Sequence, residues 1–178
     1  MKKVTEKDAP RPKGGSGGAR SIRSATVILH VDDDPKDSEL LRAAVRKANL
    51  PWGLQQVEDG EQAIQYLGGA EYYSDRQRYP MPEMVLLDLK MPGLTGFDVL
   101  KWIRGHKKLF KLPVIILSGS ALQDDIRHAY DAGATSCIIK PLGFQALVKL
   151  MKGLKTAWPD VMAPGNGINR ISPPQPRF

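Results

Sequence analysis

The stretch "ATVILHVDDDP", residues 25–35, places a mostly apolar run directly before three aspartates and a proline. A short apolar run rich in β-branched residues is typical of a buried strand. The pair Asp34–Pro35 is typical of a helix start, because an aspartate can accept hydrogen bonds from free helix amides and proline fits the first turn. The stretch therefore predicts a strand over 25–31 followed at once by a helix, the first part of a βαβ unit.

Four further apolar runs follow, with room for a helix between each pair. They cover residues 53–57, 84–89, 113–119 and 136–140. This alternation predicts a doubly wound (βα)5 parallel sheet of strand order 2-1-3-4-5, with helices on both faces. Gln55 and Gln56 suit an edge position for the second strand. Capping-box pairs, Asp59 with Gln62 and Thr95 with Asp98, indicate the starts of the second and third helices. Asp124 and Asp125 favour the start of a fourth helix, which would end at Gly133, and a fifth helical pattern covers 144–157.

The connection over residues 68–83 is long for a sheet of this kind. Its tyrosines, Tyr72, Tyr73 and Tyr79, could form a contact surface for a partner. The more ordinary interpretation, which we favour, is that they pack over the adjacent helix and strand.

The net charge of +7 is concentrated at the two ends of the chain. Residues 1–25 contain seven Lys or Arg and two acidic residues, whereas residues 26–158 contain seventeen and sixteen. The length of 178 residues and 42% hydrophobic composition favour one domain. We expect a flexible basic arm at 1–25, a folded domain at 26–158 and a flexible Pro/Gly-rich tail at 159–178. The arm could touch nucleic acid or an acidic partner, but we expect a solvated arm and no nucleic-acid partner.

Two further features of the composition concern the compartment. A single cysteine, Cys137, excludes an intramolecular disulfide, and no paired Cys or His spacing suggests a zinc site. The first 25 residues contain no apolar segment of the kind found in secretory signals or membrane spans. We therefore expect a cytoplasmic protein without a membrane partner.

Three carboxylates follow two strands that are neighbours in the predicted order. Asp32 and Asp33 follow the first strand and Asp88 ends the third, where a doubly wound sheet binds its ligands. They could be ordinary caps at strand ends, but their convergence favours a cation site. Carboxylates this close need either a raised pKa or a cation. An all-oxygen set without His or Cys indicates Mg²⁺ rather than zinc.

Two further side chains are expected at the same edge. Lys140 ends the fifth strand, where it is either a structural counterion or a group that binds an incoming anion. Ser118 ends the fourth strand, where a lone serine usually caps the next helix. A metal, a carboxylate, a hydroxyl and an ammonium around one pocket suit phosphoryl transfer, in which positioning and charge neutralisation provide most of the catalysis.

Four motifs carry a family resemblance. The segments "ILHVDDDP", "VLLDLKMPGLTGFDVL", "VIILSGS" and "AGATSCIIKPL" resemble, in this order and spacing, the receiver domain of two-component response regulators. The resemblance covers roughly residues 26–158 and implies a flavodoxin-like fold. The segments "YPMPEMVLLDL" and "LKTAW" most resemble single-domain regulators that serve phytochrome-type histidine kinases.

The resemblance implies a role for each residue of the site. Asp88 would accept a phosphoryl group from a sensor histidine kinase or phosphotransfer protein. Mg²⁺ would be bound by Asp33, Asp88 and the backbone carbonyl of Lys90, with Asp32 helping through water. Lys140 would pair with the phosphoryl oxygens, Ser118 would donate its hydroxyl, and the Lys140–Pro141 bond would be cis.

Two residues would govern access to the site. Gly119 would leave one side of the pocket open, so that a phosphodonor or a hydrolytic water enters easily. The long side chain of Lys90 would either attract the donor or obstruct that water, and the sequence does not decide between them.

One position departs from the family pattern. Cys137 stands where an aromatic switch residue is common, three residues before the lysine. The switch is then either muted or works through other groups, and a compact strand residue is a better interpretation of the cysteine than a redox sensor.

The resemblance also leads to expectations about output. No output domain is expected after the fifth helix, so the signal would pass through protein contacts. Homodimerisation or docking is expected through the helix 4, strand 5 and helix 5 face, which contains Ile138, Leu142 and Leu147.

Two other classes of function compete with this one. A Mg²⁺-dependent aspartyl phosphatase would need a second acid where this chain has Lys90, so we do not expect an enzyme beyond self-catalysed phosphorylation and dephosphorylation. The main alternative is a non-phosphorylated scaffold of the same fold that binds a partner through its basic arm.

Overall fold

The computed structural model describes residues 26–119 and 122–162. These residues form one parallel sheet of order β2-β1-β3-β4-β5, which confirms the predicted doubly wound fold. β2 is an edge strand, as its glutamines predicted. The expected arm at 1–25 and the end of the expected tail, 163–178, lie outside the described residues. The strands are β1 (Thr26–Val31), β2 (Trp52–Val57), β3 (Met84–Leu87), β4 (Val114–Ser118) and β5 (Ser136–Ile139).

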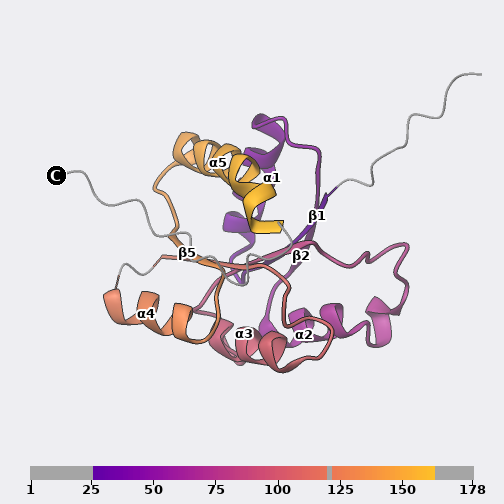
Figure 1. Ribbon diagram of the computed structural model, residues 1–178. Helices are drawn as coiled ribbons and strands as arrows, with labels where there is room; N and C mark the ends of the chain where they lie inside the picture. Colours follow the sequence, from indigo (N-terminus) through magenta and orange to yellow (C-terminus); the bar gives the residue numbers. More distant parts are fainter. Residues whose placement is uncertain (1–25, 120–121, 163–178) are drawn as a thin grey trace, which may run out of the picture.

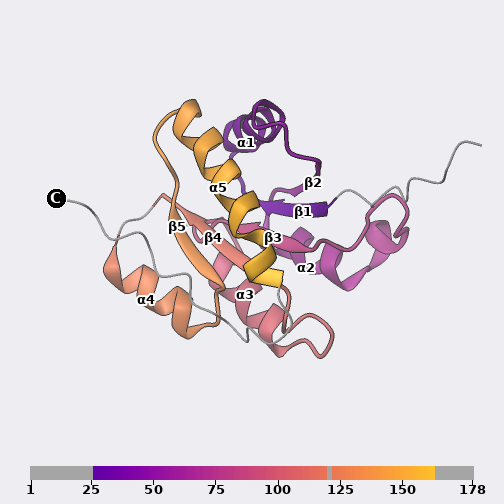
Figure 2. The same cartoon turned by 45° about the horizontal axis from the view of Figure 1, so that its top comes forward.

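The helices form a layer on each face of the sheet. In Figures 1 and 2, α1 and α5 cover one face, and α2, α3 and α4 cover the other. Alternate strand residues enter two separate cores, as the period of two in a strand requires: Ile28 and Leu86 lie in the first core, Leu29 and Leu87 in the second. The helices are α1 (Pro35–Lys47), α2 (Gly60–Gly68), α3 (Gly96–Gly105), α4 (Gln123–Asp131) and α5 (Phe144–Met162), with the short 3-10 helix η1 (Glu71–Ser74) after α2.

The helix starts follow the local signals in the sequence. The side chain of Asp34 accepts a hydrogen bond from the Lys36 amide at 2.8 Å, so the third aspartate of the opening stretch is an N-cap. Asp59 caps α2 in the same way, and Thr95 and Asp98 form a full capping box on α3. These caps fix the starts of α1, α2 and α3.

The connection between α2 and β3 is organised by one arginine. The guanidinium of Arg76 donates to the backbone carbonyls of Tyr66 and Leu67 at 2.8 and 3.0 Å, near the end of α2. Tyr73 and Tyr79 pack against the core beside it, as the sequence suggested, whereas Tyr72 is 64% exposed. The connection is therefore folded against the body of the domain.

Three details of the sequence reading are corrected. Leu147 is only 6% exposed and packs in the core beneath α1 and α5, so it cannot line an outer docking face. The structure contains no cis peptide bond in its described residues, so the Lys140–Pro141 bond is trans. α5 continues to Met162 rather than ending near residue 157.

Among the described residues, no helix is long and apolar enough to cross a membrane.

Candidate functional site

The carboxylates after β1 and β3 meet at one edge of the sheet. Val31 and Leu87 are paired in register, so the residues that follow them leave the sheet side by side. The Asp88 amide donates to the Val31 carbonyl at 2.9 Å, which extends this pairing by one step. As a result, Asp32, Asp33 and Asp88 each offer a carboxylate oxygen within 4.8 Å of the others.

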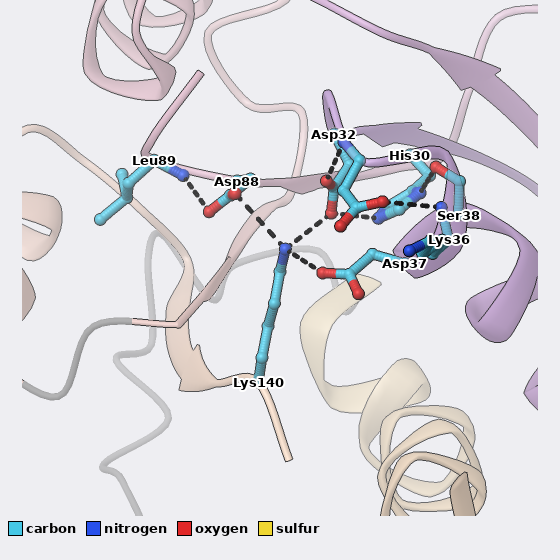
Figure 3. A network of polar contacts seen from close by, with 9 residues as sticks. His30, Asp32, Lys36, Asp37, Ser38, Asp88, Leu89 and Lys140 are labelled. Atoms are coloured by element: carbon cyan, nitrogen blue, oxygen red, sulfur yellow. Dashed lines mark hydrogen bonds and ion pairs between the residues drawn. The ribbon is translucent and has the colours of Figure 1, made fainter. Parts of the chain in front are cut away.

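Lys140 reaches this group from the end of β5. Its ammonium lies 2.8 Å from Asp32 Oδ2, 2.8 Å from Asp37 Oδ2 and 3.3 Å from Asp88 Oδ2. Figure 3 shows the ammonium between these three carboxylates, with the side chain extending away below them. The Lys140 amide donates to the Ser118 carbonyl at 2.7 Å, which ties the lysine to the end of β4. Strands from both halves of the sheet therefore contribute to one charged cluster.

The two oxygens of Asp88 have different environments. Oδ1 accepts a hydrogen bond from the Leu89 amide at 2.7 Å, whereas Oδ2 faces the Lys140 ammonium. Burial and the nearby charge of Asp32 raise the pKa of Asp88, whereas Lys140 and the Leu89 amide lower it. Burial is the largest of these effects, so the pKa lies above its ordinary value. The ionised form of Asp88 thus depends on nearby positive charge.

Asp32 is held in its ionised form more firmly. Its burial alone would raise its pKa, but hydrogen bonds from His30, Lys140 and the Asp34 amide outweigh burial and lower the pKa to about 2. For Lys140, burial favours the neutral form, but the carboxylates of Asp32 and Asp37 dominate and the pKa is raised. Asp32 and Lys140 are therefore a charged pair at neutral pH.

The remaining predicted site residues surround this cluster less tightly. Asp33 and Lys90 are exposed, and a side-chain carbon built at Gly119 would meet no atom within 4 Å. Ser118 is 2% exposed at the end of β4. A hollow of about 460 Å³ opens beside Asp33, lined by Glu58, Asp59, Glu61, Pro92, Gly93 and Leu94. Asp33 is thus the cluster's solvent-facing carboxylate.

Cys137 lies in the core rather than at the site's surface. It is 8% exposed, and its amide donates to the Tyr130 hydroxyl of α4 at 3.3 Å. Burial raises the pKa of its thiol, and the nearby charge of Asp125 raises it further. A buried thiol that keeps its proton fits a packing role and not a reactive one.

The sequence analysis missed two members of the cluster. Asp37 lies in the first turn of α1 and bonds Lys140 across 103 positions of the chain. His30 is 1% exposed in β1, with Nε2 at 3.4 Å from Asp32 Oδ2 and Nδ1 at 3.2 Å from the Ser38 hydroxyl. Asp37 looked like an ordinary charge at a helix start, and a lone histidine in a strand carries no pattern that names its partner.

The donor set fits a hard divalent cation. The three side chains that offer oxygens close enough to share a metal ion, Asp32, Asp33 and Asp88, are all carboxylates. Oxygen donors of this kind suit Mg²⁺, Ca²⁺ or Mn²⁺ better than zinc. A cation would also reduce the repulsion between these carboxylates, two of which, Asp32 and Asp88, are buried.

Comparison with known proteins agrees with this geometry. The model of the response regulator receiver domain family matches residues 28–152. The chain belongs to this family. Receiver domains are phosphoacceptor domains of two-component systems, without a dedicated catalytic activity, and they bind a divalent metal through aspartates. They interact with sensor histidine kinases or phosphotransfer proteins.

Several relatives cover most of this receiver. A probable methanogenesis regulatory protein, FilR2 of Methanothrix harundinacea, is 31% identical over 80% of this chain and 90% of its own. The solved structure of the phosphorylated cyanobacterial phytochrome response regulator RcpA is 30% identical, with a TM-score of 0.71 over 79% of this chain and 98% of its own. Response regulator RPA3017, from red light signaling of R. palustris, is 31% identical, with a TM-score of 0.73 over 77% and 96%.

One solved structure shows a metal in a similar receiver. The Mn²⁺-bound form of response regulator Rcp1 is 28% identical to this chain, with a TM-score of 0.66, and covers 75% of this chain and 94% of its own. The full-length response regulator Rcp1 of a Synechocystis strain is 28% identical over 74% of this chain and 88% of its own length.

Proposed function

We propose that Asp88 accepts a phosphoryl group from a phosphohistidine of a sensor histidine kinase or phosphotransfer protein, with Mg²⁺ bound. The arrangement of the Asp88 carboxylate carries this proposal. Its Oδ1 is held by the Leu89 amide, while its Oδ2 lies 3.3 Å from the Lys140 ammonium at the end of the sheet. One oxygen is thus fixed by the backbone and the other faces the positive charge.

The transfer needs no proton at Asp88. Oδ2 of the ionised carboxylate attacks phosphorus, the P–N bond of the phosphohistidine breaks, and its electron pair remains on the imidazole nitrogen. The Lys140 ammonium, already beside Oδ2, offsets the negative charge of the incoming phosphoryl group. We assign the Ser118 hydroxyl as a further donor, supported by its position at the end of β4 beside Lys140.

The metal would be held by the aspartates that the fold brings together. Asp33 and Asp88 would be direct ligands with the Lys90 carbonyl, and Asp32 would act through water. When bound, Mg²⁺ supplies positive charge that stabilises phosphoryl oxygens. The set of three carboxylate oxygens supports this assignment, as does the Mn²⁺-bound form of the relative Rcp1.

For output, we propose protein contacts through the surface formed by α4, β5 and α5. Leu142 is 98% exposed and Ile139 is 48% exposed beside it, which supports an apolar contact such as a homodimer. Ile139, rather than the buried Leu147 expected from the sequence, supplies an exposed apolar side chain on this surface. The similarity to the phytochrome response regulator RcpA and to RPA3017, a response regulator in red light signaling, supports a phytochrome-type kinase as the donor.

Intact-mass analysis tests the phosphoacceptor assignment. Wild type and Asp88→Asn are each incubated with acetyl phosphate and Mg²⁺, and each is repeated with a chelator. We expect one phosphoryl adduct on the wild type with Mg²⁺ and none on the variant, because an amide oxygen is a poor nucleophile. Asp33→Asn, with Asp88 intact, is expected to need more Mg²⁺ for the same adduct. An equal adduct on Asp88→Asn would refute the assignment.

A further inference from the structure

We propose that Asp37 withholds the Lys140 ammonium from the incoming phosphoryl group and so slows phosphorylation of Asp88. This inference rests on the proposed phosphoacceptor function and adds a residue to it. Asp37 comes from the first turn of α1, so it belongs to a different element from the three aspartates of the cation cluster. Figure 3 shows its carboxylate pointing at the ammonium from the α1 side.

The hydrogen-bonding capacity of Lys140 is already used. An ammonium has three protons, and three carboxylate oxygens surround it, from Asp32 and Asp37 at 2.8 Å and from Asp88 at 3.3 Å. An oxygen of a phosphoryl group arriving at Asp88 can therefore receive a proton from Lys140 only after one of these bonds is given up.

Burial decides which bond is given up. The Asp32 side chain is 1% exposed, so breaking its bond to Lys140 would leave a buried carboxylate with less compensation. The Asp88 bond is the one that brings Lys140 to the reacting oxygen. The Asp37 side chain is 41% exposed, so water can replace the ammonium there at low cost. Lys140 must leave Asp37 in order to bind the phosphoryl group.

Replacing Asp37 should change the phosphorylation rate only modestly. The rate should rise, whereas it would fall if Asp37 served only to hold Lys140 in place. A bond to a carboxylate of this exposure changes an equilibrium constant by a factor of at most about five. Removing it leaves Lys140 bonded to Asp32 and Asp88, with one proton available for the phosphoryl group. The amide oxygen of asparagine can still accept a hydrogen bond but carries no charge, so it releases the ammonium more easily. Asp37→Asn should therefore be phosphorylated about two- to fivefold faster than wild type.

Loss of a negative charge near the site could also speed the reaction, so the control must remove the same charge. Asp34 is three residues away, exposed, and bonded to the Lys36 amide. Asparagine is also a good N-cap, so Asp34→Asn removes one charge while the helix start is kept. Salt screens the long-range effect of either charge but does not restore the Asp37 contact.

The experiment measures the rate of phosphoryl uptake from acetyl phosphate at saturating Mg²⁺, at low and high salt, for wild type, Asp37→Asn and Asp34→Asn. In this reaction Oδ2 of Asp88 attacks phosphorus, the bond between phosphorus and the acetyl oxygen breaks, and acetate leaves with the electron pair. We expect Asp37→Asn to be faster than wild type at both salt concentrations. Asp34→Asn should approach the wild-type rate at high salt.

Three results would overturn the inference. Asp37→Asn could be no faster than wild type, it could match Asp34→Asn at both salt concentrations, or urea unfolding could show that it is not folded while a folded Asp37→Ser shows no acceleration. A wild type that takes up no phosphoryl group would instead overturn the proposed function, and this inference with it.

Discussion

The substitution Asp32→Asn tests whether the buried ion pair at the site stabilises the fold. Asp32 is 1% exposed and its pKa is lowered from the ordinary 3.8 to about 2. One pKa unit corresponds to about 1.4 kcal/mol. Ionised Asp32 therefore contributes about 2 kcal/mol to the free energy of unfolding at pH 7.

The pH dependence has a definite sign. A carboxyl whose pKa is lower in the folded state stabilises the fold above its unfolded pKa, and this stabilisation is lost as the pH falls through the folded pKa. For Asp32 the window runs from above pH 3.8 down to about pH 2. The difference between wild type and Asp32→Asn should be about 2 kcal/mol at pH 7 and roughly half of that at pH 3.

Urea unfolding, followed by tryptophan fluorescence with a chelator present, measures this difference. The chelator is needed because a bound cation would also pair with the carboxylates. Asp33→Asn is the matched control, since it removes a neighbouring but exposed carboxylate and should change stability by less. A difference between wild type and Asp32→Asn that is the same at pH 7 and pH 3 would refute the reasoning.

Two further predictions concern the framework around the site. A side chain at Gly96 would collide with the Asp88 carbonyl, so Gly96→Ala should lower the free energy of unfolding in urea by about 2 kcal/mol or more. Gly105→Ala is the control, because its added carbon meets no atom within 4 Å. An equal loss of stability in the two variants would contradict the packing argument. Arg76→Ala should cost about 2 kcal/mol and speed proteolysis between α2 and β3, because three backbone carbonyls lose a charged donor. Arg78→Ala, which removes contacts to the rings of Tyr72 and Tyr79, should lower the free energy of unfolding by less. A larger loss for Arg78→Ala than for Arg76→Ala would be evidence against the organising role of Arg76.

Several parts of the fold and site were predictable because their signals are local. The cap at Asp34 depends on an amide two residues away, and the capping box at Thr95 on a residue three positions away. Apolar runs separated by helical patterns led to the parallel sheet and its order. Once that order is known, Asp32 and Asp88 must lie at one edge, since each directly follows a strand.

Other parts depended on how the helices pack. The sequence placed Leu147 on an outer face, but the docking of α5 against α1 buries it. The spacing of residues does not indicate which of several exposed acids at a helix start will meet a distant lysine. That choice depends on the position of α1 relative to β5.

The sequence by itself therefore determined the strands, the helix starts and the aspartates that end β1 and β3. Only the tertiary structure decided that Lys140 is shared among Asp32, Asp37 and Asp88, and that His30 bonds Asp32 beneath the site. The physical reason is distance along the chain. A cap joins residues two or three positions apart, whereas the Lys140 contacts join residues 52 to 108 positions apart and exist only when the strands and α1 are packed together.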